Sequence, residues 1–137
     1  MHTEGPHTLV AMTTLLALLL YVWMGIRVGQ GRGKFGISAP ATTGHPEFER
    51  HFRVASNTLE NLPIFLAGLW LFALFVDEKV ACGLGLVWIV GRILYMLGYV
   101  QDPAKRSLGF GIQAIAGLAL LLGSLGGVAW QMAHGAL

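Results

Sequence analysis

The segment PEFERHFRVASNTLENLPIFLAGLW, residues 46–70, joins a charged half to an almost entirely apolar half. Its charged and amide side chains are spaced three or four residues apart: Arg50, Arg53, Asn57 and Glu60. Because an α-helix turns about 100° per residue, these four side chains fall within an arc of about 80°. The segment therefore predicts a membrane-spanning helix with a polar stripe along one face.

The composition of the whole chain indicates a membrane protein. The 137 residues are 55% hydrophobic and 12% charged, whereas a soluble domain has about 45–50% apolar and about 25% charged residues. Disordered chains are poor in apolar residues, so disorder is excluded. The single cysteine excludes an internal disulfide scaffold. A net charge of +2 is too small for a nucleic-acid surface, and the length fits one domain, residues 1–137.

Four stretches are long and apolar enough to cross the roughly 30 Å hydrocarbon core, which takes about 20 residues of helix. They are residues 8–26, 52–76, 80–100 and 108–133. Only helices and closed barrels satisfy the backbone in lipid, and the alternation typical of a barrel is absent from the sequence. We therefore expect an all-α integral membrane four-helix bundle. The first stretch lacks the basic start and short apolar core of a signal peptide, so it is expected to be a retained helix.

The connections between these stretches differ in length and charge. Residues 27–50 predict a long first loop, residues 77–79 a tight turn, and Pro103 is expected to end the third helix within a short third connection. Of the nine basic residues, all except Lys79 lie in or near the first and third connections. The positive-inside rule therefore predicts that these connections face the cytoplasm. For Arg27 and Lys34, orientation alone is a sufficient interpretation.

Polar residues inside the predicted spans need a further explanation. Glu60 lies about 15 Å along the helix from Arg50, and an ionisable group at that depth costs at least about 2.5 kcal/mol. We therefore expect Glu60 to face the bundle interior or a wet cavity. One interpretation is that Glu60 pairs with Arg92 or Arg53 and holds the bundle together.

The other interpretation is a binding site for a polar ligand. Arg92, Tyr95 and Tyr99 share a face of the third predicted helix, so cations, an amide, a carboxylate and two phenols gather at the cytoplasmic side. This is more than one ion pair requires. Arginines suit carboxylates and Glu60 suits an ammonium group, so the ligand is expected to be a small zwitterion with additional carboxylates.

Two motifs resemble the MAPEG family, the membrane-associated proteins in eicosanoid and glutathione metabolism. The first is the set Arg53, Asn57 and Glu60 within the segment quoted above. The second is GRILYMLGY, residues 91–99, followed by DPAKR, residues 102–106, which is similar to the third helix and third loop of family members. The resemblance extends from residue 32 to residue 106 without an obvious gap.

The resemblance implies a homotrimer that binds glutathione, as co-substrate, between neighbouring subunits near the cytoplasmic face. The positions that match glutathione-contacting residues are Arg32, Arg53, Asn57, Glu60, Tyr95 and Tyr99. Arg106 matches the arginine that stabilises the glutathione thiolate, which makes it the catalytic candidate. Its charge suits that role, because a cation lowers the pKa of a nearby thiol and the thiolate is the nucleophile. The five histidines are scattered, so no metal site is expected.

The expected function is therefore a membrane-bound glutathione transferase that conjugates glutathione to lipophilic electrophiles, with reduction of lipid hydroperoxides as a second activity. The apolar substrate is expected to enter from the bilayer along a groove between subunits. The alternative is a non-catalytic lipid-binding member of the same family, against which the retention of Arg106 argues. A purely structural bundle is disfavoured by the cost of the charges inside the spans.

Three positions depart from the pattern of the family's eicosanoid-forming members. Asn61 stands where they have tyrosine, Ala55 where they have glutamine, and Gly33 where they have a second arginine. These departures argue against a specific eicosanoid substrate and leave the natural electrophile open. The short chain and the lack of a retention tail favour a bacterial inner membrane over the endoplasmic reticulum.

Overall fold

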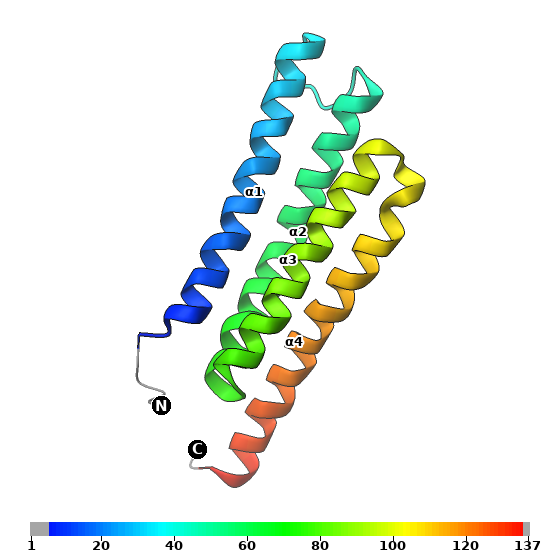
Figure 1. The fold of residues 1–137 in the computed structure, drawn as a ribbon. Helices are drawn as coiled ribbons and strands as arrows, with labels where there is room; N and C mark the ends of the chain where they lie inside the picture. The colour runs from blue at the N-terminus through cyan, green and yellow to red at the C-terminus, as the bar shows by residue number, and fades with distance from the viewer. Residues whose placement is uncertain (1–5, 136–137) are drawn as a thin grey trace.

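The computed structural model describes residues 6–135, so both ends of the expected 1–137 domain lie outside the described residues. It contains α1 (Thr8–Phe35), α2 (Pro46–Phe75), α3 (Glu78–Gln101), the short 3-10 helix η1 (Pro103–Arg106) and α4 (Ser107–His134). The four long helices lie side by side (Figure 1). Helix α3 packs against the other three long helices, and α2 packs against α1 and α4. The expected all-α four-helix bundle is thereby confirmed.

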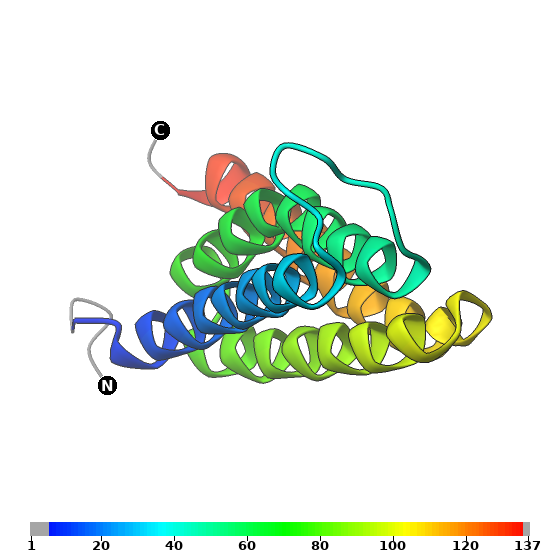
Figure 2. The same ribbon diagram turned by 90° about the horizontal axis from the view of Figure 1, so that it is seen from above.

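The connections alternate between the two ends of the bundle. The α1–α2 connection and η1 lie at one end, whereas the α2–α3 turn, the start of α1 and the end of α4 lie at the other (Figure 1). Seen from above, the α1–α2 connection arches to one side of the helix ends (Figure 2). All four long helices have the length and hydropathy of membrane spans. The protein is therefore an integral membrane protein. The connection within the α1–α2 hairpin and the connection within the α3–α4 hairpin lie at the same end of the bundle (Figure 1).

The first connection is shorter than predicted, because it covers residues 36–45 rather than 27–50. Helix α1 continues through the glycine-rich segment and ends where Gly36 adopts a left-handed φ of 65°. Each interior glycine costs about 1 kcal/mol of helix stability relative to alanine. Packing offsets this cost, because a Cβ on the buried Gly31 would lie 3.1 Å from Cδ1 of Phe48 in α2. The glycine-rich composition after residue 26 predicts a loop, but the contact of Gly31 with Phe48 stabilises the helix there.

Helix α2 also begins earlier than the predicted span. Pro46 occupies its first turn, and Nδ1 of His45 accepts a hydrogen bond from the N–H of Glu47 at 3.2 Å. A side-chain cap followed by proline is a common helix start, since proline fixes φ and its missing N–H would be unpaired there. The helix continues through Pro63. Helices α3 and α4 begin and end within two residues of the predicted spans.

The core and the outer surface of the bundle are both apolar. Phe65 stacks on Trp88 with ring centroids 3.9 Å apart, and Leu69 and Leu120 are fully buried around them. Large apolar side chains also cover the outside of the bundle, of which Ile115 is 73% exposed. Water-soluble monomers rarely expose such continuous apolar surface. The outer surface therefore suits contact with lipid tails or with further copies of the chain.

At Gly109, α4 lies close against the backbone of α3, which gives a test of the packing. A Cβ at this position would overlap the backbone of Tyr95 and Leu94. Gly109→Ala is therefore expected to force the two helices apart and to lower the free energy of unfolding by about 1–3 kcal/mol. Thermal unfolding in detergent measures this loss. Gly111→Ala is the control, because a Cβ there meets nothing within 4 Å. Equal stability of the two variants would contradict the close approach.

Candidate functional site

A cavity of about 470 Å³ lies near the η1 end of the bundle. It is lined by residues of α2, α3, η1 and α4: Arg53, Asn57, Tyr95, Tyr99, Arg106 and Phe110. Five of these six residues are site residues predicted from the sequence. The fold therefore brings side chains from opposite halves of the chain into one cavity.

Helical spacing and the η1 turn set the geometry of this cavity. Arg53 and Asn57 are one turn apart on α2, as are Tyr95 and Tyr99 on α3. The two tyrosine rings have centroids 5.6 Å apart. Arg106 is exposed at the rim, where its guanidinium carbon lies 5.7 Å from the ring centroid of Tyr99. Two guanidinium groups and two phenols thus face one space, which suits a ligand that carries carboxylates.

A second cavity of about 230 Å³ shares Arg53 and Tyr99 with the first. Arg50 also lines it, but Nη1 of Arg50 donates hydrogen bonds to the carbonyl oxygens of Val100 and Gln101, at 3.2 and 3.3 Å. These carbonyls belong to the last turn of α3, where a cation is favoured. Arg50, part of the predicted polar stripe, therefore holds the end of α3 against the start of α2.

Behind the cavity, Asn57 is held by two neighbours. Arg92 is fully buried, and its Nη2 donates to Oδ1 of Asn57 at 2.9 Å and to Oγ1 of Thr58 at 2.7 Å. Nδ2 of Asn61 donates to the backbone oxygen of Asn57 at 2.8 Å and approaches its Oδ1 at 3.4 Å. The oxygen of the Asn57 amide is therefore occupied by donors. Its NH₂ group remains to donate to an acceptor in the cavity.

Glu60 does not take the position expected from the sequence. It is exposed on the outside of the single chain, and within residues 6–135 it forms no ion pair with Arg53 or Arg92. Within the part of the single chain that the structure describes, Glu60 therefore neither faces the bundle interior nor pairs with Arg92 or Arg53, and the other expectation, that it faces a wet cavity, stays a prediction. Arg92 points inward to Asn57 and Thr58 instead. The proposed contact between Glu60 and glutathione stays a prediction.

Arg32 also lies away from the cavity. Its Nη1 donates to the carbonyl oxygen of Ala41 at 2.8 Å and to that of Ile37 at 3.4 Å. Its guanidinium lies 5.0 Å from the ring centroid of Phe48. Within the single chain, Arg32 therefore ties the α1–α2 connection to the end of α1, and its contact with glutathione stays a prediction.

Two supporting residues were not identified as site residues from the sequence. Phe110 lines the cavity and lies one turn after Arg106. Asn61 lies one turn after Asn57 and was noted only as a departure from a family pattern. Each of them follows a predicted site residue by four residues, and side chains with this spacing lie next to each other on one helix face. This spacing is the sequence signal that indicates both residues.

The fold and the cavity together define a class of protein: an integral membrane four-helix bundle with a polar, cationic site at one end. The sequence profile of the MAPEG family matches residues 10–126. The chain belongs to the MAPEG family, a family of glutathione-using membrane enzymes. The resemblance of its motifs to that family is thereby confirmed.

Three relatives show the range of similarity. Human microsomal glutathione S-transferase 2 is 40% identical over 123 residues, which are 89% of this chain and 84% of the relative. Bovine leukotriene C4 synthase is 41% identical over 98 residues, which are 72% of this chain and 65% of the relative. An uncharacterized protein of the cyanobacterium Synechocystis is 48% identical over 122 residues, which are 89% of each chain.

Proposed function

We propose that this protein is a membrane-bound glutathione transferase that conjugates glutathione to lipophilic electrophiles. The observation that carries the proposal is the cavity that joins Arg53 and Asn57 to Tyr95, Tyr99 and Arg106. Arg53 and the Asn57 amide donate to the carboxylates of glutathione, and Arg106 stabilises its thiolate. In conjugation the thiolate sulfur forms a bond to the electrophilic carbon, and the leaving group departs with the electron pair of its broken bond. Where the electrophile is an activated alkene, the resulting carbanion takes up a proton from water. The same thiolate supports reduction of lipid hydroperoxides as a second activity, in which two glutathione molecules are oxidised to the disulfide while the hydroperoxide becomes an alcohol and water.

An apolar groove beside the cavity supports a lipophilic second substrate. Its volume is about 230 Å³, and apolar side chains of α2, α3 and α4 dominate its lining, among them Ile64, Trp88 and Leu121. Phe110 lines both the groove and the cationic cavity. The side chain of Phe110 thus stands between the apolar groove and the cationic cavity, and this supports an apolar substrate that reaches the cavity from the lipid side.

The outward position of Glu60 supports a shared site in a homotrimer. A carboxylate about 15 Å along the span from Arg50 is unfavourable against lipid, and a neighbouring copy with its bound ligand covers it. Native mass spectrometry in mild detergent is expected to give three times the chain mass of 14.7 kDa. A stable monomer that still binds glutathione would contradict a site between subunits.

Glu60→Gln tests the contribution of this carboxylate to binding. The substitution removes the negative charge but keeps a hydrogen-bonding amide, so glutathione affinity is expected to fall about tenfold, within the range for charged hydrogen bonds. Calorimetry on the purified assembly measures the change. Asp77→Asn is a control, since Asp77 lies at the opposite end of the bundle and caps α3 through a hydrogen bond to Val80 N–H at 2.8 Å. An unchanged affinity in Glu60→Gln would assign Glu60 a structural role.

Turnover decides between an enzyme and the alternative, a non-catalytic lipid-binding member of the family. Purified protein in detergent is supplied with glutathione and a chloronitrobenzene electrophile, and the conjugate is quantified by chromatography. We expect product formation that requires both the protein and glutathione. Glutathione binding without product, over a range of electrophiles, would support the binding protein instead.

For its location, we propose a bacterial inner membrane with the η1 end in the cytoplasm. The cations Lys105 and Arg106 at that end support this orientation through the positive-inside rule. The cyanobacterial relative supports a bacterial setting. Glutathione would then reach the cavity from the cytoplasm.

A further inference from the structure

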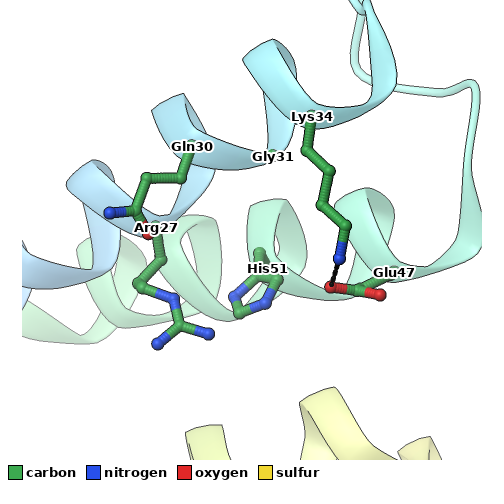
Figure 3. A pocket seen from close by; sticks show the side chains of 6 residues that line it. All are labelled: Arg27, Gln30, Gly31, Lys34, Glu47 and His51. Carbon is green, nitrogen blue, oxygen red and sulfur yellow. Dashed lines mark ion pairs between the residues drawn. The ribbon is translucent and has the colours of Figure 1, made fainter.

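A further polar pocket lies between α1 and α2, apart from the two cavities described above. Its volume is about 170 Å³, where a single water needs about 10–15 Å³. The side chains that line it are drawn in Figure 3: Arg27, Gln30, Gly31, Lys34, Glu47 and His51. None of them lines the cavity that contains Arg106. The proposed transferase function makes no use of this pocket.

Two helix faces create the hollow. The four residues of α1 are spaced at i, i+3, i+4 and i+7, which places them on one face. Glu47 and His51 are one turn apart on the facing helix α2. Gly31 has no side chain, so the two helices approach closely there, and the longer side chains on either side line a hollow that is open to the surface.

The charge of the pocket is predominantly positive. Nζ of Lys34 lies 3.5 Å from Oε2 of Glu47, so one cation is partly neutralised. Arg27 forms no ion pair within the part of the chain that the structure describes. His51 is buried and lies between Arg27 and the Lys34–Glu47 pair (Figure 3). An anion can therefore contact the Arg27 guanidinium, with the Gln30 amide as a neutral donor beside it.

The depth of the pocket in the membrane indicates the kind of anion. The uncharged stretch 8–26 is about 29 Å long as a helix, which matches the roughly 30 Å hydrocarbon core. Arg27 is the first charged residue after it, and Lys34 lies about 10 Å further along the axis. The headgroup layer adds roughly 5–7 Å on each side of the core. The lining of the pocket therefore runs from the edge of the hydrocarbon core at Arg27 to a few ångströms beyond the headgroup layer at Lys34, and it crosses the depth of lipid phosphates.

We infer that this pocket binds the phosphate of an anionic phospholipid headgroup, with Arg27 and Lys34 as its charged contacts. Basic pockets between membrane helices on the cytoplasmic side bind anionic headgroups in this manner. Glu47 opposes the anion and restrains Lys34. The inference does not depend on the transferase function, because the two sites share no residue.

The test uses delipidated protein in neutral detergent, titrated with phosphatidylglycerol, with phosphatidylcholine and with inorganic phosphate. Native mass spectrometry quantifies bound lipid, and phosphorus NMR follows inorganic phosphate. We expect phosphatidylglycerol to bind more tightly than phosphatidylcholine, and inorganic phosphate to bind only weakly. Inorganic phosphate that binds as tightly and displaces the lipid would overturn the assignment to a headgroup.

Matched variants locate the binding. Arg27→Gln and Lys34→Gln are each expected to weaken phosphatidylglycerol binding about fivefold, and Glu47→Gln is expected to strengthen it by a similar factor. Lys105→Gln removes the same charge from an exposed side chain at the same end of the bundle and is expected to have no effect. Equal losses in Lys34→Gln and Lys105→Gln would show unspecific attraction and overturn the proposal.

Two further measurements separate lipid binding from a structural clamp. Arg27→Lys keeps the positive charge and is expected to retain most of the lipid binding. If Arg27 mainly maintains the fold, this variant is expected to lose lipid binding as Arg27→Gln does. If Glu47→Gln weakens lipid binding and lowers thermal stability, the Lys34–Glu47 pair only fastens α1 to α2, and the proposal is wrong. Glutathione conjugation is expected to be unchanged in these variants, so failure of this inference leaves the proposed function intact.

Discussion

Replacing Arg106 with alanine is expected to lower the rate of glutathione conjugation by about 100- to 1000-fold, the usual effect of removing one preorganised stabiliser of negative charge. Glutathione binding is expected to be largely intact, because Arg53 and Asn57 remain in the cavity. Arg106 is exposed, and within residues 6–135 its one side-chain hydrogen bond is from Nη1 to the carbonyl oxygen of Pro103, at 3.3 Å. Its removal therefore changes the charge near the sulfur without disturbing the bundle.

Three measurements on this variant are needed: turnover, calorimetric glutathione affinity and the ultraviolet absorbance of the bound thiolate near neutral pH. The thiolate signal is expected to fall together with the rate. Lys105→Ala serves as the control, since Lys105 is the neighbouring cation but lacks the planar guanidinium that can donate two parallel hydrogen bonds. A wild-type rate with an undiminished thiolate signal in Arg106→Ala would exclude this role.

The main rival is a tyrosine hydroxyl that donates a hydrogen bond to the sulfur. Tyr95 is buried and Tyr99 is half-buried, and both line the cavity. If one of them is the principal stabiliser, its phenylalanine variant loses rate and thiolate signal while Arg106→Ala keeps both. The two hypotheses therefore predict opposite results for the same pair of measurements.

The sequence was sufficient for the parts of the site that local helix geometry controls. Pairs such as Arg53–Asn57 and Tyr95–Tyr99 lie one turn apart in any helix, so their grouping followed once the spans were recognised. Pro103 and the charges around it likewise indicated a short connection that carries Arg106. These features depend on residues close in sequence. That the α2 pair, the α3 pair and Arg106 share one cavity depends instead on the packing of α2 and η1 against α3.

Local helix geometry does not predict which face of each helix points into the bundle. Whether Glu60 faces inward depends on how α2 is rotated against α3, which is set by packing over the whole interface. Arg92 instead turns inward to Asn57, and Glu60 is left outside. The glycine-rich end of α1 was missed for a related reason. It remains helical because Gly31 packs on Phe48, a contact that propensity does not reveal.

Arg92→Met is expected to lower glutathione affinity by about 10- to 100-fold without any loss of stability. Nε and Nη1 of Arg92 are buried and have no hydrogen-bond partner within the described residues 6–135. Replacing buried ionic groups with apolar side chains of similar volume is often neutral or stabilising by about 1–4 kcal/mol. Methionine, however, provides no donor to Oδ1 of Asn57. Oδ1 of Asn57 then keeps only the longer contact with Nδ2 of Asn61, at 3.4 Å, among the described residues. We expect this contact to be too weak to stop the amide from turning its oxygen toward the ligand carboxylate, which loses a charged hydrogen bond worth about 1.5–3 kcal/mol.

Thermal unfolding and calorimetry on the same purified variant separate these two effects, since stability and affinity are expected to move in opposite directions. Thr58→Val is the matched control: it removes the other acceptor of Arg92 Nη2 and leaves the Asn57 amide held. That variant is expected to retain glutathione affinity. If Arg92→Met binds glutathione as wild type does, Asn57 is oriented without Arg92. If glutathione affinity and thermal stability both fall, Arg92 stabilises the fold, and its guanidinium does not contribute to binding through the orientation of Asn57.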